Sequence, residues 1–242
     1  MAESKIALVT GGNRGIGFEV CHQLAKLGFL VILTARDAIK GLAAATEITK
    51  STGKNVDFFK VDVTLPADID DLKKYLISKY GRVDILINNA GILPDNPIPG
   101  IFTHPSIFET AIDVIDSAIR TNVYGSILMC QAVVPLMKSN NYGRIVNVSS
   151  TMGQLSTIDG GTPGYRISKV ALNAVTRIVA GELEGTNILC NSVSPGWVKT
   201  EMGGPQANRS AEEGAKIIVS FATLPDGGPN GGFFRDGVQI EW

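Results

Sequence analysis

This chain of 242 residues contains few cysteines and histidines, and its positive and negative charges nearly balance. The three cysteines (Cys21, Cys130 and Cys190) are far apart in the sequence and form no Cys-x-x-Cys pair. This sparse set argues against a disulfide framework and against a zinc site, so we expect no metal. The formal net charge is −1, which gives no electrostatic reason to expect nucleic acid or an anionic membrane as a partner.

Long hydrophobic segments are also missing from the sequence. The chain passes from Glu3, Ser4 and Lys5 directly into a short apolar run, without the hydrophobic region of a signal peptide. The early run Phe29–Leu33 is far too short to span a bilayer. We therefore expect a cytoplasmic protein. Because 44% of the residues are hydrophobic and 19% are charged, the chain can bury a sizeable core.

What the sequence does contain is a regular alternation of short apolar runs and segments with helical periodicity. The predicted strands are Ile6–Val9, Leu30–Leu33, Val56–Phe59, Val83–Ile87, Arg144–Val148, Ile188–Val193 and Gly232–Arg235. The predicted helices cover 15–27, 38–51, 67–80, 108–138, 164–183 and 211–222. Apolar runs without polar alternation are typical of strands covered on both faces. The pattern predicts an α/β fold: one domain over residues 1–242, with a doubly wound, Rossmann-type parallel sheet of about seven strands flanked by helices.

A proline-rich stretch interrupts this rhythm after the fourth predicted strand. Pro94, Pro97, Pro99 and Pro105 exclude a regular helix or a central strand there. The resulting loop leaves the carboxyl end of the strand, which is the edge where open α/β sheets bind ligands. The sequence leaves two interpretations open: the loop lines the pocket, or it is a surface insertion.

A glycine-rich turn follows the first predicted strand and opens the first predicted helix. It reads Thr-Gly-Gly-Asn-Arg-Gly-Ile-Gly over residues 10–17. Glycines let the backbone approach a pyrophosphate, and the helix N-terminus offers free N–H groups and the positive end of the helix dipole. The turn therefore indicates a nucleotide site.

A second motif, Tyr165-x-x-x-Lys169, lies in the helix after the fifth predicted strand. Residues four apart share one helix face. A lysine beside a phenol favours the phenolate and should lower the pKa of Tyr165, which makes it a candidate general acid. The strand before it ends in Ser149 and Ser150, and strand alternation aims only one of them at the site. Ser150 fits the register better, and Ser149 is the alternative.

Together with Asn88-Asn89-Ala90-Gly91 and the Pro195-Gly-x-x-x-Thr200 segment, these motifs resemble the short-chain dehydrogenase/reductase family over nearly the whole chain. The resemblance implies a nicotinamide cofactor and the catalytic residues Asn122, Ser150, Tyr165 and Lys169, with Asn122 holding a water that links Lys169 to solvent. The motifs and the resemblance together assign cofactor binding to Gly11, Asn13, Arg14, Gly15, Ile16, Gly17, Arg36, Asp62, Val63, Asn89, Ala90, Gly91, Tyr165, Lys169, Pro195, Gly196, Val198 and Thr200.

The choice between NADH and NADPH depends on the end of the second predicted strand. By resemblance, Ala35 occupies the place of the acidic residue that selects NAD. Arg36 follows it, and Arg14 supplies a second guanidinium from the glycine turn. Planar guanidinium groups can donate paired hydrogen bonds to the oxygens of a 2′-phosphate. We therefore predict NADPH. If Asp37 instead reaches the ribose, the preference is reversed.

Within the family, the sequence looks like the carbonyl reductase branch, with one departure. Many members of that branch carry a long helical insert between the catalytic Ser and Tyr, whereas only fourteen residues separate Ser150 from Tyr165 here. Because such inserts block subunit contacts, we expect a homodimer or homotetramer formed through 108–138 and 164–183. His22 and His104 match no catalytic position.

The expected reaction is the reduction of a ketone or aldehyde to an alcohol, with Tyr165 as the proton donor. The predicted pocket walls suit a fairly bulky, uncharged carbonyl compound. These walls are Met152, Leu155, Ile158, Trp197 and Met202, with 203–210 as a mobile lid. One alternative is 3-oxoacyl-thioester reduction, with Arg120, Arg166 and Arg177 facing an acidic carrier protein. A second is a nucleotide sensor without turnover, against which the intact Ser, Tyr and Lys set argues.

Overall fold

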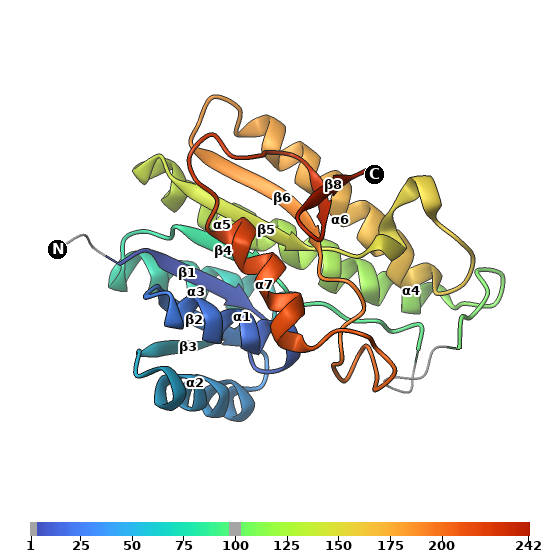
Figure 1. The fold of residues 1–242 in the computed structure, drawn as a ribbon, viewed down its shortest axis with the longest axis horizontal. Helices are drawn as coiled ribbons and strands as arrows, with labels where there is room; N and C mark the ends of the chain where they lie inside the picture. The colour runs from blue at the N-terminus through green and yellow to red at the C-terminus, as the bar shows by residue number, and fades with distance from the viewer. Residues whose placement is uncertain (1–3, 97–102) are drawn as a thin grey trace.

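The computed structural model describes residues 4–96 and 103–242 and is built on one eight-stranded sheet (Figure 1). The strands are β1 (Ile6–Thr10), β2 (Leu30–Ala35), β3 (Val56–Lys60), β4 (Ile85–Asn88), β5 (Gly143–Val148), β6 (Ile188–Ser194), β7 (Phe233–Arg235) and β8 (Val238–Ile240). Their order is β3-β2-β1-β4-β5-β6-β7-β8. All neighbours pair in parallel except β7 and β8. The winding changes direction between β1 and β4, which is where doubly wound sheets bind ligands.

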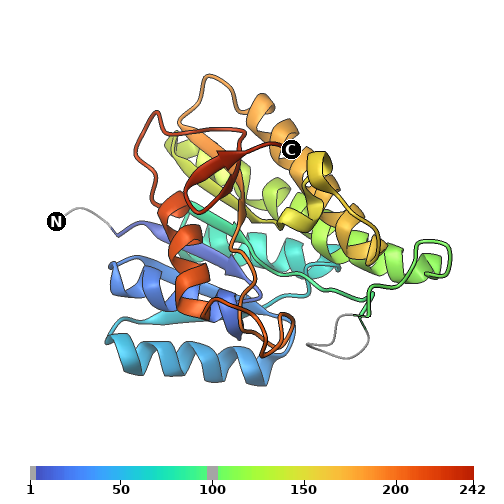
Figure 2. The ribbon, with the colours of Figure 1, turned by 45° about the vertical axis from the view of Figure 1, so that its right-hand side comes forward.

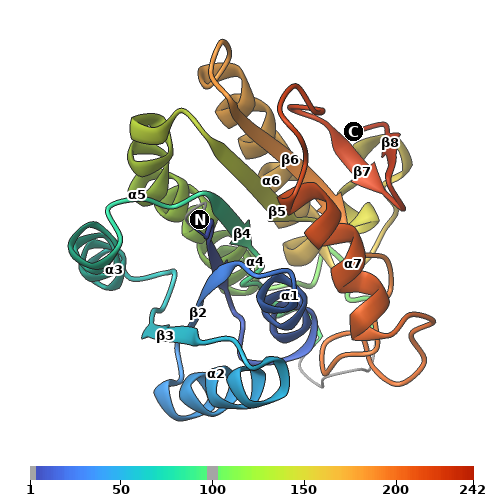
Figure 3. The same cartoon turned by 60° about the vertical axis from the view of Figure 1, so that its left-hand side comes forward.

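Helices cover both faces of the sheet (Figure 3). They are α1 (Gly15–Lys26), α2 (Ala38–Thr52), α3 (Pro66–Lys79), α4 (Ile112–Ile119), α5 (Gly125–Asn140), α6 (Pro163–Glu182) and α7 (Ala211–Ala222). A π-helical turn, η1 (Arg120–Tyr124), joins α4 to α5, and two 3-10 turns, η2 (Thr151–Gly153) and η3 (Leu155–Thr157), follow β5. The helices α1, α2 and α7 lie on one face, and α3, α5 and α6 lie on the other.

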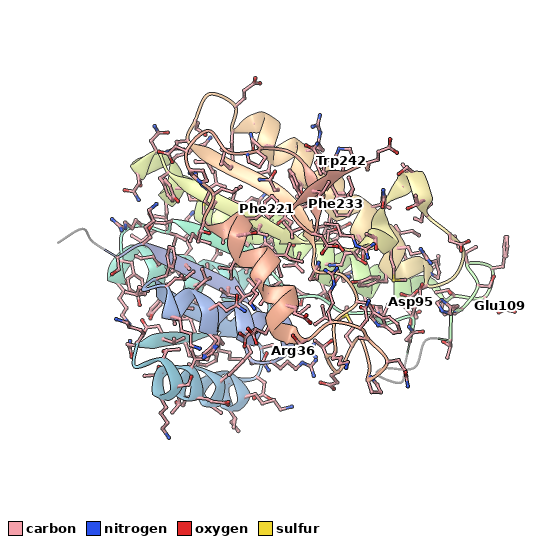
Figure 4. All side chains as sticks on the ribbon, viewed as in Figure 1. Arg36, Asp95, Glu109, Phe221, Phe233 and Trp242 are labelled. Atoms are coloured by element: carbon pink, nitrogen blue, oxygen red, sulfur yellow. The ribbon has the colours of Figure 1, made fainter. Side chains whose placement is uncertain are left out.

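Strand alternation divides the hydrophobic core into two clusters, one on each face of the sheet. Along β1, Ala7 and Val9 face the α1 and α7 side, while Ile6 and Leu8 face the α3 and α5 side. On the first face, Phe221 of α7 packs against Phe234 of β7, with ring centroids 4.5 Å apart (Figure 4 labels Phe221). Both faces of the central strands are therefore buried, as their continuous apolar runs predicted.

The predicted α/β architecture is confirmed, with small differences in the bounds and the number of helices and strands. The predicted helix over 108–138 begins at Ile112 and contains the π turn. The eighth strand was missed, although Asp236-Gly237 is a typical two-residue hairpin turn, and both residues have positive φ (55° and 77°). Pro97 and Pro99 lie outside the described residues. In the described part of the chain, no helix combines the length and the apolar character needed to cross a membrane.

The C-terminal hairpin lies beside the segment that follows β5 (Figure 2). The Trp242 carbonyl accepts a hydrogen bond from the Ser156 amide at 2.8 Å. The Trp242 ring stacks on Phe233 at 5.7 Å (Figure 4), and the Arg177 guanidinium lies over its other side at 6.0 Å. The end of the chain thus fixes the segment between the two predicted catalytic motifs.

Candidate active site

A cleft of about 1180 Å³ opens at the carboxyl edge of the sheet, around the switch between β1 and β4. Every residue predicted to bind the cofactor lines this cleft, from Gly11 in the glycine turn to Thr200 after β6. Of the predicted catalytic residues, Ser150, Tyr165 and Lys169 also line it. The segments that follow β1 to β6, together with α6, therefore contribute to a single cavity.

The glycine turn packs so tightly against the end of β4 that side chains have no room. Gly11 has a φ of +64°, and a Cβ there would lie 3.0 Å from Ala90 Cα. A Cβ on Gly17 would lie 2.3 Å from the Gly11 carbonyl oxygen. Asn89 completes the junction by donating from Nδ2 to the carbonyls of Thr10 (2.9 Å) and Gly11 (3.1 Å). The result is a backbone cradle at the start of α1, where free N–H groups and the positive end of the helix dipole can bind a pyrophosphate.

Two arginines lie at the rim of the cradle. Arg36 follows β2, at the place labelled in Figure 4, and Arg14 lies within the turn. Asp37 is occupied elsewhere, because its Oδ1 accepts from the Lys40 amide at 3.0 Å and caps α2. Arg14 forms an ion pair with Glu201 across the cleft. Both partners are more than half exposed, so the pair is weak and a phosphate can displace Glu201.

Asp62 lies at the same end of the cleft, after β3. Its Oδ1 accepts from the Thr64 amide at 2.9 Å and from the Thr64 hydroxyl at 2.7 Å, which fixes a tight turn. Val63 beside it packs against Gly125, where a Cβ would come within 2.7 Å of the valine side chain. This turn forms the wall where the resemblance expects the adenine.

At the other end of the cleft, a hydrogen bond joins the side chains of Ser150 and Tyr165. Ser149 also lines the cleft, but its hydroxyl is engaged elsewhere, since its Oγ donates to Asn173 Oδ1 at 2.7 Å and the residue is buried. The structure therefore brings Ser150, rather than Ser149, to Tyr165. The Ser150 Oγ also accepts from the Met152 amide at 3.1 Å, which fixes its direction.

Lys169 lies one helical turn beyond Tyr165, with its Nζ 5.5 Å from the centre of the phenol ring. The Nζ donates to the Val148 carbonyl at 2.7 Å. Burial lowers the pKa of Lys169 to about 8, because desolvation disfavours the charged form. Burial also raises the pKa of Tyr165 to about 12, although the Ser150 hydrogen bond acts in the opposite direction. The predicted lowering of the Tyr165 pKa was therefore wrong for the protein alone, because desolvation outweighs the hydrogen bond from Ser150.

Asn122 lies behind the cleft, in the π turn between α4 and α5. Its side chain exchanges two hydrogen bonds with the backbone of Ile92: Oδ1 accepts from the amide at 2.8 Å and Nδ2 donates to the carbonyl at 3.0 Å. Nδ2 also donates to Ser168 Oγ at 2.9 Å. Asn122 Oδ1 and Lys169 Nζ both lie close to Gly91, so the asparagine and the lysine are neighbours. Single π turns inside α-helices are frequent at functional sites.

The segment after β6 closes the cleft from the α7 side. Thr200 Oγ1 accepts from the Gly203 amide at 3.0 Å, and Trp197 Nε1 donates to the Gly203 carbonyl at 2.8 Å. Arg209 donates to the Pro195 carbonyl at 3.2 Å and forms an ion pair with Asp236 of the β7–β8 turn. The predicted lid region is thus tied back onto the Pro195–Thr200 segment by hydrogen bonds.

The residues around the substrate end differ in part from those expected. Met152, Trp197 and Met202 line the cleft as predicted. Leu155 and Ile158 are exposed and are not among the described residues that line it, because the Ser156–Trp242 hydrogen bond holds η3 outside the cleft.

Four basic residues that had no predicted place in the pocket line the cleft as well. They are His104, Arg120, Arg166 and Lys199. Ile92 and Leu93 line it too, so the described ends of the proline-rich loop form part of the wall. No local motif pointed to His104. Its segment is held near the site by its contact with Gly161 and by the hydrogen bond from the Thr162 amide to the Pro105 carbonyl.

Comparison with known proteins agrees with this geometry. The short chain dehydrogenase family model matches residues 5–219. The chain is 33% identical to (+)-neomenthol dehydrogenase of Capsicum annuum (96% of this chain, 95% of the relative). It is 32% identical to carbonyl reductase [NADPH] 3 of Rattus norvegicus (99% of each).

A solved structure, the NADPH-bound carbonyl reductase from chicken fatty liver, superposes with a TM-score of 0.84. It is 29% identical, and the match covers 99% of this chain and 100% of the other. The alignment with the Capsicum enzyme extends over 301 positions, more than the 242 residues of this chain, so that relative contains segments that are missing here. The protein is an oxidoreductase that belongs to the short-chain dehydrogenase/reductase family.

Proposed function

We propose that this protein uses NADPH to reduce a ketone or aldehyde to an alcohol. The observation that carries the proposal is the convergence of Ser150, Tyr165 and Lys169 in the cleft that also contains the glycine cradle. A nicotinamide held between these two ends would lie beside a proton donor. The relatives named carbonyl reductase [NADPH] and neomenthol dehydrogenase add support.

The cradle at Gly11–Gly17 would hold the pyrophosphate, and Asp62 with Val63 would border the adenine. Arg36, together with Arg14 once Glu201 is displaced, would bind the 2′-phosphate through guanidinium forks. Asp37 supports this assignment because it caps α2 instead of pointing into the cleft. When bound, NADPH supplies the hydride that goes to the carbonyl carbon.

The chain's own residues handle the carbonyl oxygen and the proton. The Ser150 hydroxyl donates a hydrogen bond to the carbonyl oxygen and holds it beside the phenol. Tyr165 gives its proton to that oxygen as negative charge develops there. Lys169 stabilises the phenolate that results. Asn122, which borders Gly91 and Lys169, would hold the water through which the proton is replaced.

The substrate end favours a fairly bulky carbonyl compound with an apolar body. Met152, Trp197 and Met202 present apolar surface toward Ser150 and Tyr165, which form the polar focus. Trp197 is 45% exposed and Met202 is 36% exposed, so both side chains have surface left to cover a substrate. Binding of such a compound would bury this surface and exclude water from the proton donor.

The test is consumption of NADPH with a panel of neutral ketones and aldehydes, run in parallel with NADH and with Tyr165→Phe. We expect turnover with NADPH, a preference for bulky apolar compounds, and a loss of about 10²–10⁴-fold in the variant. NADPH binding without turnover of any carbonyl compound would refute the proposal and favour a nucleotide sensor.

A second candidate, 3-oxoacyl-thioester reduction, is favoured by one observation. Arg120 and Arg166 both line the cleft and could face an acidic carrier protein at its mouth. Arg177 does not contribute, because it donates to the Gly231 carbonyl at 3.1 Å and packs on Trp242. Reduction of a carrier-bound 3-oxoacyl group with a much lower KM than that of the free ketone would select this candidate.

We also propose that the chain forms a homodimer or homotetramer through α4, α5 and α6. Phe108, Ile112 and Ile178 leave large apolar side chains exposed on or next to these helices, and a second copy would cover them. Light scattering at assay concentration should give at least twice the mass of the chain, and a monomeric mass would refute this assembly.

A further inference from the structure

Asp95 is a buried carboxylate without a role in the family motifs. It lies on the loop after β4, beside α4 and the start of α6 (Figure 4), and is 5% exposed. Its two oxygens accept separate backbone hydrogen bonds: Oδ1 from the Gly164 amide at 2.7 Å and Oδ2 from the Tyr165 amide at 2.8 Å. A side chain 70 positions away in the sequence therefore holds the main chain of the proton donor.

The first turn of α6 depends on this carboxylate because it has no local cap. The N-cap residue, Thr162, has a φ of +47°, and within the described residues its side chain makes no capping hydrogen bond. Free N–H groups at a helix start need acceptors, and a carboxylate there also meets the positive end of the helix dipole. Asp95 supplies both in place of Thr162.

The other side of Tyr165 is fixed to the same region of the fold. Ser168 Oγ donates to the Tyr165 carbonyl at 2.7 Å and accepts from Asn122 Nδ2 at 2.9 Å. The Pro105 carbonyl accepts from the Thr162 amide at 3.1 Å. The loop after β4 and the π turn thus hold both the amide and the carbonyl of the residue that carries the phenol.

We propose that Asp95 is the positioning residue of Tyr165: its carboxylate fixes the first turn of α6 and places a negative charge at the backbone amide of the residue that carries the phenol. The proposal rests on the proposed function for Tyr165. The charge opposes the helix dipole, and a nearby negative charge disfavours the phenolate, so Asp95 keeps Tyr165 protonated until the carbonyl oxygen takes the proton. Removing this charge should lower the pH at which Tyr165 ionises.

Other charged or titratable groups line the same cleft as the phenol and have to stay constant in a test. On α6 they are Lys169 and Arg166, on η1 the group is Arg120, and on the described part of the loop after β4 it is His104. From the segment after β6, Lys199 and Glu201 line the same cleft. A substitution confined to Asp95 changes none of them.

The sharpest variant is Asp95→Asn, which keeps the size and one acceptor oxygen but removes the charge. The measurement is the ionisation midpoint of Tyr165 in the complex with oxidised cofactor, followed by NMR of carbon-13 at the tyrosine Cζ and assigned with Tyr165→Phe. We expect the midpoint to fall by up to about one pH unit, the scale of a partly buried helix-dipole interaction. An unmoved midpoint overturns the proposal, whatever happens to thermal stability.

Asp95→Ala tests the positioning directly, and Glu213→Ala is the matched control. The Glu213 carboxylate helps to cap α7, because its Oε2 accepts from the Ser210 amide at 2.8 Å, and Glu213 is not among the described residues that line the cleft. Loss of a cap should lower the Tm of either variant by about 2–4 °C. Only Asp95→Ala should lower kcat, by about 10–100-fold with the KM for NADPH within about threefold. Equal kcat in the two variants would overturn the proposal.

The proposal for Asp95 and the proposed function can fail separately, because the NMR titration needs no turnover. A wild-type protein that reduces no carbonyl compound would refute the proposed function, and the effect of Asp95 on the ionisation of Tyr165 could still be measured.

Discussion

The two ends of the cleft are built from different parts of the polypeptide. At the glycine-turn end (residues 11–17), the binding surface is backbone, and glycines at 11 and 17 are required because a Cβ would collide with neighbouring main chain. At the catalytic end (Ser150, Tyr165 and Lys169), the surface consists of side chains, and desolvation shifts the pKa values of both the half-buried tyrosine and the buried lysine.

This difference explains why one end can be described from local sequence and the other only from tertiary contacts. A cradle made of backbone depends on glycines that are consecutive or nearly so, and thus on one short motif. Side chains at the catalytic end are aimed by partners far away in the sequence: Asn173 turns Ser149 away, Asp95 holds the Tyr165 amide, and Trp242 fixes the segment between the motifs.

The largest effect should separate the two adjacent serines at the end of β5. Ser150→Ala removes the hydroxyl that would bind the carbonyl oxygen, and kcat/KM should fall by about 10²–10³-fold. Ser149→Ala removes only the buried hydrogen bond to Asn173, so its main effect should be a loss of about 1 kcal/mol in stability. Steady-state kinetics and urea unfolding of both variants provide the check. Equal losses of activity would contradict the assignment of Ser150 to substrate binding and of Ser149 to structural support.

Lys169→Met should show that burial of the charged lysine at the catalytic end destabilises the folded protein. The folded-state pKa of about 8 lies below the ordinary lysine value of 10.5, so the native state loses this proton more easily than the unfolded chain. The destabilisation is then complete below about pH 8 and is relieved as the pH rises toward about 10.5. At about pH 7 the variant should be more stable by up to about 3 kcal/mol.

The measurement is urea unfolding of the wild type and Lys169→Met at several pH values between about 7 and 10. The difference in unfolding free energy should shrink as the pH rises. A difference that is constant across this range would contradict the assignment, because a packing effect alone does not titrate.

Cofactor selectivity tests the other end of the cleft. Arg36→Ala should raise the KM for NADPH by about 10–100-fold and leave the KM for NADH within about twofold, since only the 2′-phosphate loses a partner. Glu201→Gln should lower the KM for NADPH by a few-fold at most, because it frees Arg14 from an exposed ion pair. Kinetics with both cofactors give the answer, and parallel changes for NADH and NADPH would refute the role of Arg36.

The smallest expected effect is on the KM for the substrate, and it should distinguish a residue that lines the cleft from one that lies outside it. Met152→Ala should change the KM for a bulky ketone by about 5–10-fold through lost apolar contact. Leu155→Ala should change it by less than about twofold, since Leu155 lies outside the cleft and is 62% exposed. A larger effect from Leu155 would mean that η3 closes over the substrate.

The sequence predicted nearly all of the fold, because buried parallel strands and crossover helices have distinct periodicities. It missed β8, a three-residue strand whose signal was the Asp236-Gly237 turn rather than any apolar run. At the site, motifs located Tyr165, Lys169 and the glycine cradle. They could not find Asp95 or His104, which reach the site from the described parts of the segment between β4 and α4. They misplaced Leu155 and Ile158, because the hydrogen bond between Ser156 and Trp242 decides where that segment lies.

The most direct test of the central claim is a single turnover with NADPH deuterated at C4, on each face in separate reactions, and a ketone selected from the panel. Our account predicts that one of the two labelled cofactors delivers deuterium to the carbonyl carbon of the alcohol product, and that Tyr165→Phe slows this transfer by about 10²–10⁴-fold while still binding NADPH. Consumption of NADPH without deuterium at that carbon, or an unchanged rate in the variant, would contradict it.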